Sequence, residues 1–338
     1  MAPDLTILGG GSWGTALALQ LGRAGRTVSL WVHDPVLAAV MRRDRVNAAY
    51  LPGHTLPPNV SVTSDVGEAL AGARDVMLVV PSHHCREVLR ACLPHMPHMD
   101  AAMSFCSASK GIENDSLLRV SEILADTLGE QLAGRIAVMS GPSFADEVAS
   151  GHPTAVVIAS NDGEVAARLQ RTVSTGGLRA YTSADVIGVE LGGALKNVVA
   201  IGAGVVDGLG YGTNTLAALI TRGLAEISRL AEACGGRRET LAGLAGLGDL
   251  VLTCTGRLSR NRALGVALAR GATLQQHQAA TRMVAEGVRT TLSAWRMASR
   301  LGVEMPITSQ VHAVLYKSKS PSEAIKDLLA RQLRREDS

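Results

Sequence analysis

The glycine-rich segment GGGSWG at residues 9–14 constrains the fold of this 338-residue chain more than any other part of its sequence. It follows a short apolar run at 4–9, typical of a buried strand, and leads into an Ala- and Leu-rich run at 14–24 with helical spacing. Gly9, Gly11 and Gly14 form the pattern G-x-G-x-x-G. A strand, this pattern and a helix in succession are typical of the first βα turn of a doubly wound α/β domain.

Each glycine of that turn suits a nucleotide site. The first permits the tight turn, the second lets the backbone approach a pyrophosphate, and the third lets helix and strand pack closely. The helix N-terminus adds unpaired N–H groups that face the anion. We therefore predict a dinucleotide site, with a ligand-free glycine turn as the alternative. Trp13 in this loop either forms a wall for the cofactor or folds back onto its own helix.

Repeated strand and helix patterns extend the prediction along the first half of the chain. Further strand-like runs lie at 27–32, 75–80, 102–107, 136–140 and 154–159. Helical patterns lie between them, at 35–43, 84–93, 116–128 and 163–173. This alternation predicts an α/β fold with a Rossmann-type doubly wound parallel sheet. The segment 47–60, with three prolines and no periodicity, is predicted to be an extended loop.

The sequence changes character at about Asp185, where strand-like runs stop and Ala-, Gly- and Leu-rich helical patterns continue almost to the end. A chain of this length exceeds the roughly 250–300 residues that one hydrophobic core serves. We predict a dinucleotide-binding domain at 1–185 and an all-helical, substrate-binding domain at 186–338. Because no Pro- or Ser-rich linker separates them, we expect a large interface with a cleft between the domains.

Charge and hydropathy exclude several classes of protein. The 33 Lys and Arg residues against 30 Asp and Glu give a net charge of +3, which provides no broad basic field for nucleic acid. The richest apolar run, 192–206, contains Lys196 and Asn197, so we expect no membrane span. The first residues lack the pattern of a signal peptide, which predicts a cytoplasmic protein.

Cysteine and histidine spacing gives no metal site. The five cysteines include no CxxC pair, as suits a reducing compartment. Histidines cluster at 83–84 and at 95–98, but neither cluster has a second one at zinc spacing. His83 and His84 follow a predicted strand, and we expect loop or cofactor-adjacent roles for them rather than catalysis.

The end of the second predicted strand, WVHDP, bears on cofactor choice. His33 stands where an NAD-specific fold usually presents an acid to the ribose hydroxyls, and Asp34 follows one place later. Arg42 and Arg43 lie a helix further on, so a 2′-phosphate is tolerable there. We predict NADPH as the favoured cofactor, with NADH as the alternative.

Four further motifs point to one family. They are SASKGI at 107–112, SGPSFADE at 140–147, LGGALKNVVAIGAG at 191–204 and GLGDLVLTCTGRLSRNRALG at 246–265. With GGGSWGTALA they make the chain resemble the bacterial NAD(P)-dependent glycerol-3-phosphate dehydrogenases, nearly end to end. The family interconverts dihydroxyacetone phosphate and sn-glycerol 3-phosphate for phospholipid synthesis, and this activity is what the resemblance implies.

The resemblance also implies site residues. It makes Lys196 the catalytic proton carrier. The positions that match substrate contacts are Lys110, Gly141, Ser143, Asn197, Asp249, Ser259, Arg260 and Asn261. The positions that match cofactor contacts, including the glycine loop, are Gly9, Gly11, Ser12, Trp13, Gly14, His33, Lys110, Ala145, Arg260, Val284 and Glu286.

The chemistry of these residues agrees with that reaction. Hydride delivery to C2 of the ketone leaves an alkoxide, which an ammonium group both stabilises and protonates. Lys196 lies among Gly, Ala, Leu and Val, where burial lowers a lysine pKa; the alternative is a snorkelling surface lysine. Asp249 either holds Lys196 or a substrate hydroxyl in place, or caps a helix.

Phosphate recognition is expected at SRN, residues 259–261. Ser259 is a good N-cap, so free N–H groups of the helix, the Arg260 guanidinium and the Asn261 amide can converge on a dianion. A capped helix with a solvated arginine is the alternative. Two other functions stay open: a 3-hydroxyacid dehydrogenase, and a nucleotide-sensing regulator without catalysis. Apolar helical surface in the second domain favours a homodimer.

Overall fold

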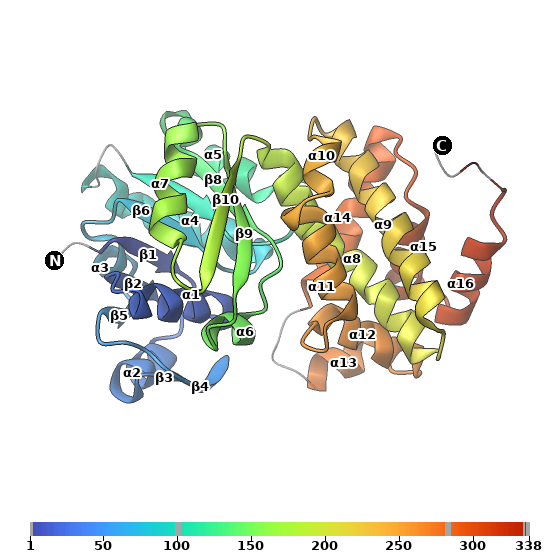
Figure 1. The fold of residues 1–338 in the computed structure, drawn as a ribbon, viewed down its shortest axis with the longest axis horizontal. Coiled ribbons are helices and arrows are strands. Elements are labelled where there is room, and N and C mark those ends of the chain that lie inside the picture. Colours follow the sequence, from blue (N-terminus) through green and yellow to red (C-terminus); the bar gives the residue numbers. More distant parts are fainter. Residues whose placement is uncertain (1–2, 99–102, 281–284, 334, 336–338) are drawn as a thin grey trace.

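The computed structural model describes residues 3–98, 103–280, 285–333 and 335, which form two lobes side by side (Figure 1). The sheet lobe runs from β1 to β10 and the helical lobe from α8 to α16. β10 ends at Ser183 and α8 begins at Val186, close to the predicted boundary. The division into domains at 1–185 and 186–338 stays a prediction.

The sheet lobe is built on eight hydrogen-bonded strands in the order β10-β9-β8-β7-β6-β1-β2-β5. Their bounds are β1 Leu5–Leu8, β2 Val28–Trp31, β5 Val60–Thr63, β6 Asp75–Leu78, β7 Ser104–Ser107, β8 Ile136–Ser140, β9 Thr154–Ser160 and β10 Leu178–Ser183. Among these strands only the β8–β9 pair is antiparallel. The predicted parallel sheet is confirmed apart from this pair, and each of the six predicted runs contains a strand.

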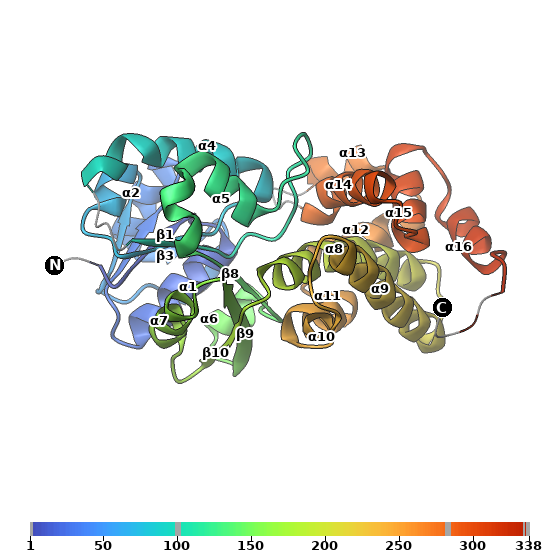
Figure 2. The same ribbon diagram turned by 90° about the horizontal axis from the view of Figure 1, so that it is seen from above.

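Helices cover both faces of the sheet, as Figure 2 shows with α4 and α5 on one side and α1 and α7 on the other. Neighbouring residues of one strand serve opposite faces: Ile7 packs in the cluster with α1 and α7, and Leu8 in the cluster with α4 and α5. This alternation explains why both faces of the predicted strands are apolar. The helices are α1 Ser12–Arg23, α2 Pro35–Asp44, α3 Val66–Leu70, α4 Cys85–Cys92, α5 Val120–Leu128, α6 Ala145–Ala149 and α7 Gly163–Val173.

The prediction of an extended loop at 47–60 is wrong. The segment contains most of an irregular hairpin, in which β3 (Val46–Asn47) pairs antiparallel with β4 (Leu51–Thr55), and Val60 begins β5. The two-residue strand β3 and the register shift within the pair leave no alternating pattern to detect. Leu51 and Leu56 are buried and tie this hairpin to the core beside α1.

The helical lobe surrounds α8 (Val186–Gly208), which α9, α11, α12, α14 and α15 all contact. The other helices are α9 Thr213–Ala233, α10 Arg238–Leu241, α11 Asp249–Thr255, α12 Arg260–Ala269, α13 Leu274–Ala280, α14 Glu286–Leu301, α15 Pro306–Tyr316 and α16 Pro321–Leu329. The predicted all-helical second half is confirmed for the described residues.

By length and apolarity alone, α8 is the one described helix that could cross a membrane, but 83% of its most apolar window is buried inside the protein. The segments Arg238–Thr255 and Arg260–Ala269 pass the same test only as a pair bent by 47°. Burial of this kind is also typical of a central core helix. The apolar composition of α8 is therefore weak evidence for a membrane span.

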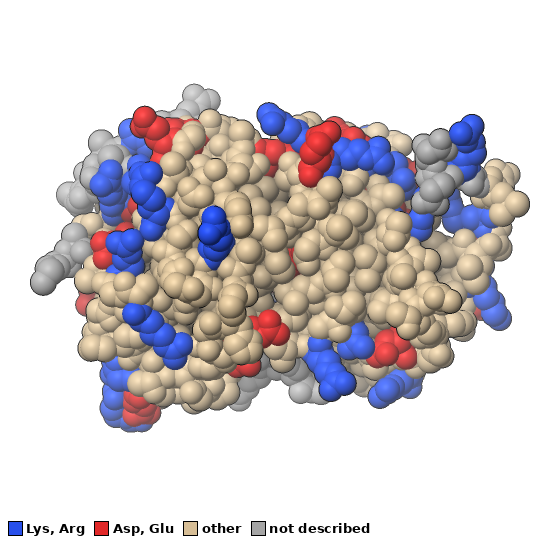
Figure 3. Space-filling view, viewed as in Figure 1, with Lys and Arg blue, Asp and Glu red and all other residues tan. Residues whose placement is uncertain are grey.

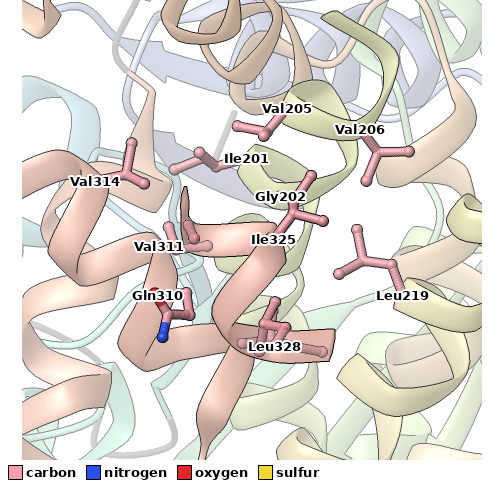
Figure 4. Close-up of a pocket in the computed structure, with 12 residues that line it drawn as sticks. Ile201, Gly202, Val205, Val206, Leu219, Gln310, Val311, Val314, Ile325 and Leu328 are labelled. Carbon is pink, nitrogen blue, oxygen red and sulfur yellow. The ribbon is translucent and has the colours of Figure 1, made fainter. Parts of the chain in front are cut away.

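Glycines bring α8 and α12 into close contact. A Cβ on Gly204 would lie 2.0 Å from the Arg262 carbonyl oxygen, and a Cβ on Gly265 would lie 2.0 Å from the Ile201 carbonyl oxygen. Both distances are too short for any side chain, so the two backbones touch at these positions. Gly202, two residues before Gly204, instead faces a small apolar cavity of about 40 Å³ between α8, α9, α15 and α16 (Figure 4).

We predict opposite effects of alanine at these two positions of α8. Gly204→Ala should lower the free energy of unfolding by about 1–3 kcal/mol, because its methyl group must push α12 away. Gly202→Ala should raise it by up to about 1 kcal/mol, since the nearest atom, Leu219 Cδ2, is 3.5 Å from the new Cβ and alanine favours helix. Urea unfolding measures both. Equal stability of the two variants would contradict the close packing of α8 and α12.

Candidate active site

Three charged side chains from different elements meet between the lobes. Lys196 comes from the middle of α8, Asp249 is the first residue of α11, and Lys110 lies in the segment after β7. The Lys196 ammonium forms an ion pair with Asp249 Oδ1. Lys110 Nζ lies 2.7 Å from Asp249 Oδ2 and donates to the Gly141 carbonyl at 3.0 Å. Asp249 thus joins the two lysines predicted for the site.

Burial sets the electrostatics of this cluster. Asp249 is 0% exposed and Lys196 is 7% exposed, so both groups have left water. Desolvation lowers the pKa of Lys196, Asp249 raises it, Lys110 lowers it, and the result is a pKa of about 7. A lysine with that pKa exchanges its proton readily near neutral pH, as a proton carrier must. The snorkelling alternative for Lys196 is therefore wrong.

The backbone before α11 aims the Asp249 carboxylate. Residues Leu244–Gly248 form a π-helical turn, in which a Cβ on Gly246 would lie 2.1 Å from the Leu241 carbonyl oxygen. The N-cap of α11 is Gly248, so Asp249 does not cap this helix. Thr253, which the sequence analysis missed, donates its hydroxyl to the Asp249 carbonyl at 2.6 Å. The same hydroxyl lies 3.5 Å from Asp249 Oδ1, so the carboxylate contacts Thr253 as well as the two lysines.

A second polar group lies one residue beyond Lys196. Asn261 Nδ2 donates to Asn197 Oδ1 at 2.9 Å, and the Gly287 N–H donates to Asn261 Oδ1 at 2.9 Å.

At the start of α12, Ser259 is the N-cap and accepts from the Arg262 N–H, while Arg260 at the first helical position is exposed. The predicted N-cap at Ser259 is confirmed, and the anion site at SRN stays a prediction.

The turn between β8 and α6 contacts Lys110. Gly141 has a φ of 140°, which strains any other residue, and its carbonyl accepts from Lys110 and, at 3.0 Å, from the Ser143 hydroxyl. Ala145 begins α6 and packs against the sheet-lobe core. Ser140, just before this turn, is buried against α8, with its Oγ 2.3 Å from the position of a Cβ on Gly193.

The segment after β7 extends to the helical lobe, as Figure 2 shows, and it contains Lys110. Ile112 packs in the core of that lobe, and the Ser293 hydroxyl of α14 contacts the Ile112 carbonyl and Asn114 Oδ1, the latter at 2.6 Å. Lys110 thus reaches Asp249 because its own chain segment is anchored on both sides of the boundary.

The glycine loop has the geometry expected of a dinucleotide site. A Cβ on Gly9, whose φ is 132°, would lie 2.2 Å from the Val79 carbonyl oxygen, and a Cβ on Gly14 would lie 1.9 Å from the Gly9 carbonyl oxygen. A Cβ on Gly11 would meet no atom of the described residues within 4 Å. The first and third glycines thus serve packing, and the second leaves the backbone open to a ligand. Ser12 begins α1, and Trp13 is half-buried against the sheet-lobe core.

The residues after β2 bear on the prediction about cofactor choice. His33 is exposed and stands edge-to-face against Trp31, with ring centroids 5.7 Å apart. Asp34 is the N-cap of α2, where it accepts from the Val36 and Leu37 N–H groups.

Arg42 and Arg43 lie in the last turn of α2, at the opposite end from His33, and Arg43 pairs with Asp44 at 2.7 Å. These arginines do not flank His33, so they give no support for a 2′-phosphate there.

Ser82 and Glu286 link the two lobes near the loop that carries Lys110. The Ser82 hydroxyl donates to Glu286 Oε2 at 3.0 Å, and a Cβ on Gly111 would lie 2.3 Å from Ser82 Oγ. Ser82 was missed because its partner is far away in the sequence. Burial and Arg289 lower the pKa of the neighbouring His83 to about 4, so it is neutral at pH 7. Val284, a predicted cofactor contact, lies outside the described residues.

Within the described part of the chain, no group of three or more His, Cys, Asp or Glu side chains could hold a metal ion.

Comparison with known proteins identifies the family of this chain. Residues 4–166 match the family described as NAD-dependent glycerol-3-phosphate dehydrogenase N-terminus, and residues 185–326 match its C-terminal counterpart. The chain belongs to the NAD-dependent glycerol-3-phosphate dehydrogenase family. Two bacterial relatives carry the name glycerol-3-phosphate dehydrogenase (NAD(P)+). The one from Koribacter versatilis is 50% identical over 97% of each chain, and the one from Citrifermentans bemidjiense is 50% identical over 99% of each.

Solved structures of this family agree with the fold. The glycerol-3-phosphate dehydrogenase of Coxiella burnetii has a TM-score of 0.91 and 42% identity, covering 98% of this chain and 99% of its own. The yeast enzyme has a TM-score of 0.81 and 25% identity, covering 98% of this chain and 100% of its own. The resemblance drawn from the motifs is confirmed.

We predict that Asp249→Asn destabilises the protein most at low pH. Without the carboxylate, the pKa of Lys196 falls further below 7, while the unfolded lysine keeps its ordinary pKa of 10.5. Below about pH 7 the wild-type fold accepts the ammonium and the variant does not, so the free energy of unfolding should drop by about 3–5 kcal/mol at pH 6 and by less at pH 9.

Urea unfolding at both pH values measures this difference. The control is Asp207→Asn, which removes a half-exposed carboxylate 3.0 Å from Arg262 Nη2 and should cost less than about 1 kcal/mol at either pH. A deficit of Asp249→Asn that is the same at pH 6 and pH 9 would show that Lys196 does not depend on this carboxylate.

Proposed function

We propose that this chain interconverts dihydroxyacetone phosphate and sn-glycerol 3-phosphate with NAD(P)H as the hydride donor. The observation that carries the proposal is the buried Lys196–Asp249–Lys110 cluster, in a chain that belongs to the NAD-dependent glycerol-3-phosphate dehydrogenase family. The cofactor, when bound, supplies the hydride that C2 of the ketone accepts. All other steps fall to the side chains of the protein.

Lys196 is proposed as the proton donor. As hydride reaches C2, negative charge develops on the carbonyl oxygen, and an adjacent ammonium both stabilises that charge and delivers the proton. The pKa of about 7 keeps a substantial fraction of Lys196 protonated at neutral pH while leaving the amine able to accept the proton in the reverse reaction. Asp249 orients this ammonium, and Lys110 is proposed to contact both substrate and cofactor.

Substrate phosphate is proposed to bind at the N-terminus of α12. The open N–H groups after Ser259, the exposed Arg260 guanidinium and the Asn261 amide offer donors suited to a dianion. Asn197, Gly141 and Ser143 are proposed to complete the substrate site. The proposed cofactor contacts are Gly9, Gly11, Ser12, Trp13, Gly14, His33, Lys110, Ala145, Arg260, Val284 and Glu286.

The cellular setting is also proposed. We infer a cytoplasmic homodimer that supplies glycerol 3-phosphate for phospholipid synthesis. Support for a homodimer comes from exposed apolar side chains of the helical lobe, such as Tyr211, Val251 and Leu258. On the face of the helical lobe seen in Figure 1, Figure 3 shows charged side chains mostly along the edges and few over α9 and α11.

The decisive experiment is NADPH oxidation by the purified protein with dihydroxyacetone phosphate. We expect turnover with the phosphate ester and far less with dihydroxyacetone, because the anion site at α12 contributes only when phosphate is present. Running the assay with NADH gives the cofactor preference. Turnover of 3-hydroxyacids instead would favour a 3-hydroxyacid dehydrogenase, and cofactor binding without any turnover would favour a nucleotide-sensing regulator.

Arg260→Ala is the control for the phosphate site. It should raise the KM for dihydroxyacetone phosphate at least tenfold, as the loss of a charge-assisted contact implies, and leave the poor turnover of dihydroxyacetone unchanged. Equal losses on both substrates would assign Arg260 to the cofactor or to the fold.

A further inference from the structure

Asn47, a residue of the β3–β4 hairpin, reaches under the glycine loop. It is 0% exposed, although its side chain is an amide. Its Nδ2 donates to the Gly10 carbonyl at 2.9 Å and to the Thr15 hydroxyl at 2.8 Å, and its Oδ1 accepts from the Tyr50 N–H at 3.2 Å. A buried amide with three hydrogen bonds is fully engaged, and one of its partners belongs to the loop that the cofactor must approach.

The contact with the Gly10 carbonyl fixes one peptide group. In a trans peptide the C=O of Gly10 and the N–H of Gly11 lie in one plane and point in opposite directions. Because Asn47 holds the carbonyl on the hairpin side, the Gly11 N–H faces the other side. Gly11 is also the N-cap of α1, so its N–H stands with the free N–H groups of that helix end.

The hydrogen bond from Asn47 to the Gly10 carbonyl restricts a loop of three consecutive glycines. Gly9, Gly10 and Gly11 have more conformational freedom than any other residues, so an unsupported loop would lose much entropy on binding an anion. On one side, a Cβ on Gly10 would lie 2.6 Å from Val32 Cγ2. On the other side, Asn47 supplies the hydrogen bond, and together they hold the loop in one conformation before any ligand arrives.

We propose that Asn47 is a positioning residue for the cofactor: through the Gly10 carbonyl it orients the Gly11 N–H toward the pyrophosphate of the dinucleotide. The inference rests on the proposed function, because it requires that NAD(P)H bind at this loop. It predicts a binding effect common to NADH and NADPH, since both contain the pyrophosphate and differ only at the ribose.

The test compares Asn47→Ala with a matched variant, Asn59→Ala. Asn59 belongs to the same connection, just before β5, and its Nδ2 donates to the carbonyls of Gly22 and Arg26 at 2.9 and 2.7 Å, at the opposite end of α1. Each variant thus removes an asparagine with two donated bonds to the α1 region, but only Asn47 contacts the glycine loop.

Kd values for NADPH and NADH are measured by fluorescence titration without substrate, and Tm is measured on the same samples. Asn47→Ala should raise both Kd values about tenfold and by the same factor. Asn59→Ala should lower Tm comparably and leave both Kd values within about twofold of wild type. Asn47→Asp keeps the shape and the acceptor for Tyr50 but loses the donor, so it should weaken binding at least as much and replaces the alanine variant if that one does not fold.

Several results would overturn the proposal. Wild-type affinity in folded Asn47→Asp would do so, as would an equal loss of affinity in Asn59→Ala. A loss confined to NADPH would place the effect at the 2′-phosphate rather than at the pyrophosphate. Failure of the wild-type protein itself to bind either dinucleotide would overturn the proposed function as well, which separates the two failures.

Discussion

The buried carboxylate of Asp249 is the group on which the arrangement of the site depends. It is buried and forms one ion pair with Lys196 of α8 and another with Lys110 of the segment after β7. The two lysines come from opposite sides of the boundary between the lobes. A carboxylate in such surroundings is stable only with partners of this kind, and two lysines this close need a carboxylate between them. The lowered pKa of Lys196 follows from the same burial, so structure and proposed chemistry have one cause.

Glycine lets the backbones come close enough for this arrangement. Gly193 lets α8 lie against Ser140 at the end of β8, Gly204 and Gly265 bring α12 against α8, and Gly246 permits the turn that aims Asp249. The apolar, glycine-rich sequence of α8 thus reflects its position at the centre of the lobe. The same principle operates in the glycine loop, where two glycines serve packing and one leaves space for a ligand.

Local signals made much of this predictable, and distant partners account for what was missed. The G-x-G-x-x-G loop, the six strand-like runs and the Ser259 cap are each specified within a few residues. The role of Asn47 depends on contacts 37 residues away, and the Lys110–Asp249 pair spans 139 residues. The sequence places the acidic residue Asp34 after β2. Only the structure shows that its carboxylate caps α2.

Single-turnover hydride transfer in Lys196→Met tests the central claim most directly. Methionine keeps much of the side-chain volume of lysine and removes the ammonium. The variant should therefore fold and bind NADPH with the same Kd as wild type. With enzyme and NADPH premixed and dihydroxyacetone phosphate added, NADPH absorbance should decay about 10²–10⁴-fold more slowly than in wild type. A near-normal decay in folded, cofactor-binding Lys196→Met would show that the proton comes from another group.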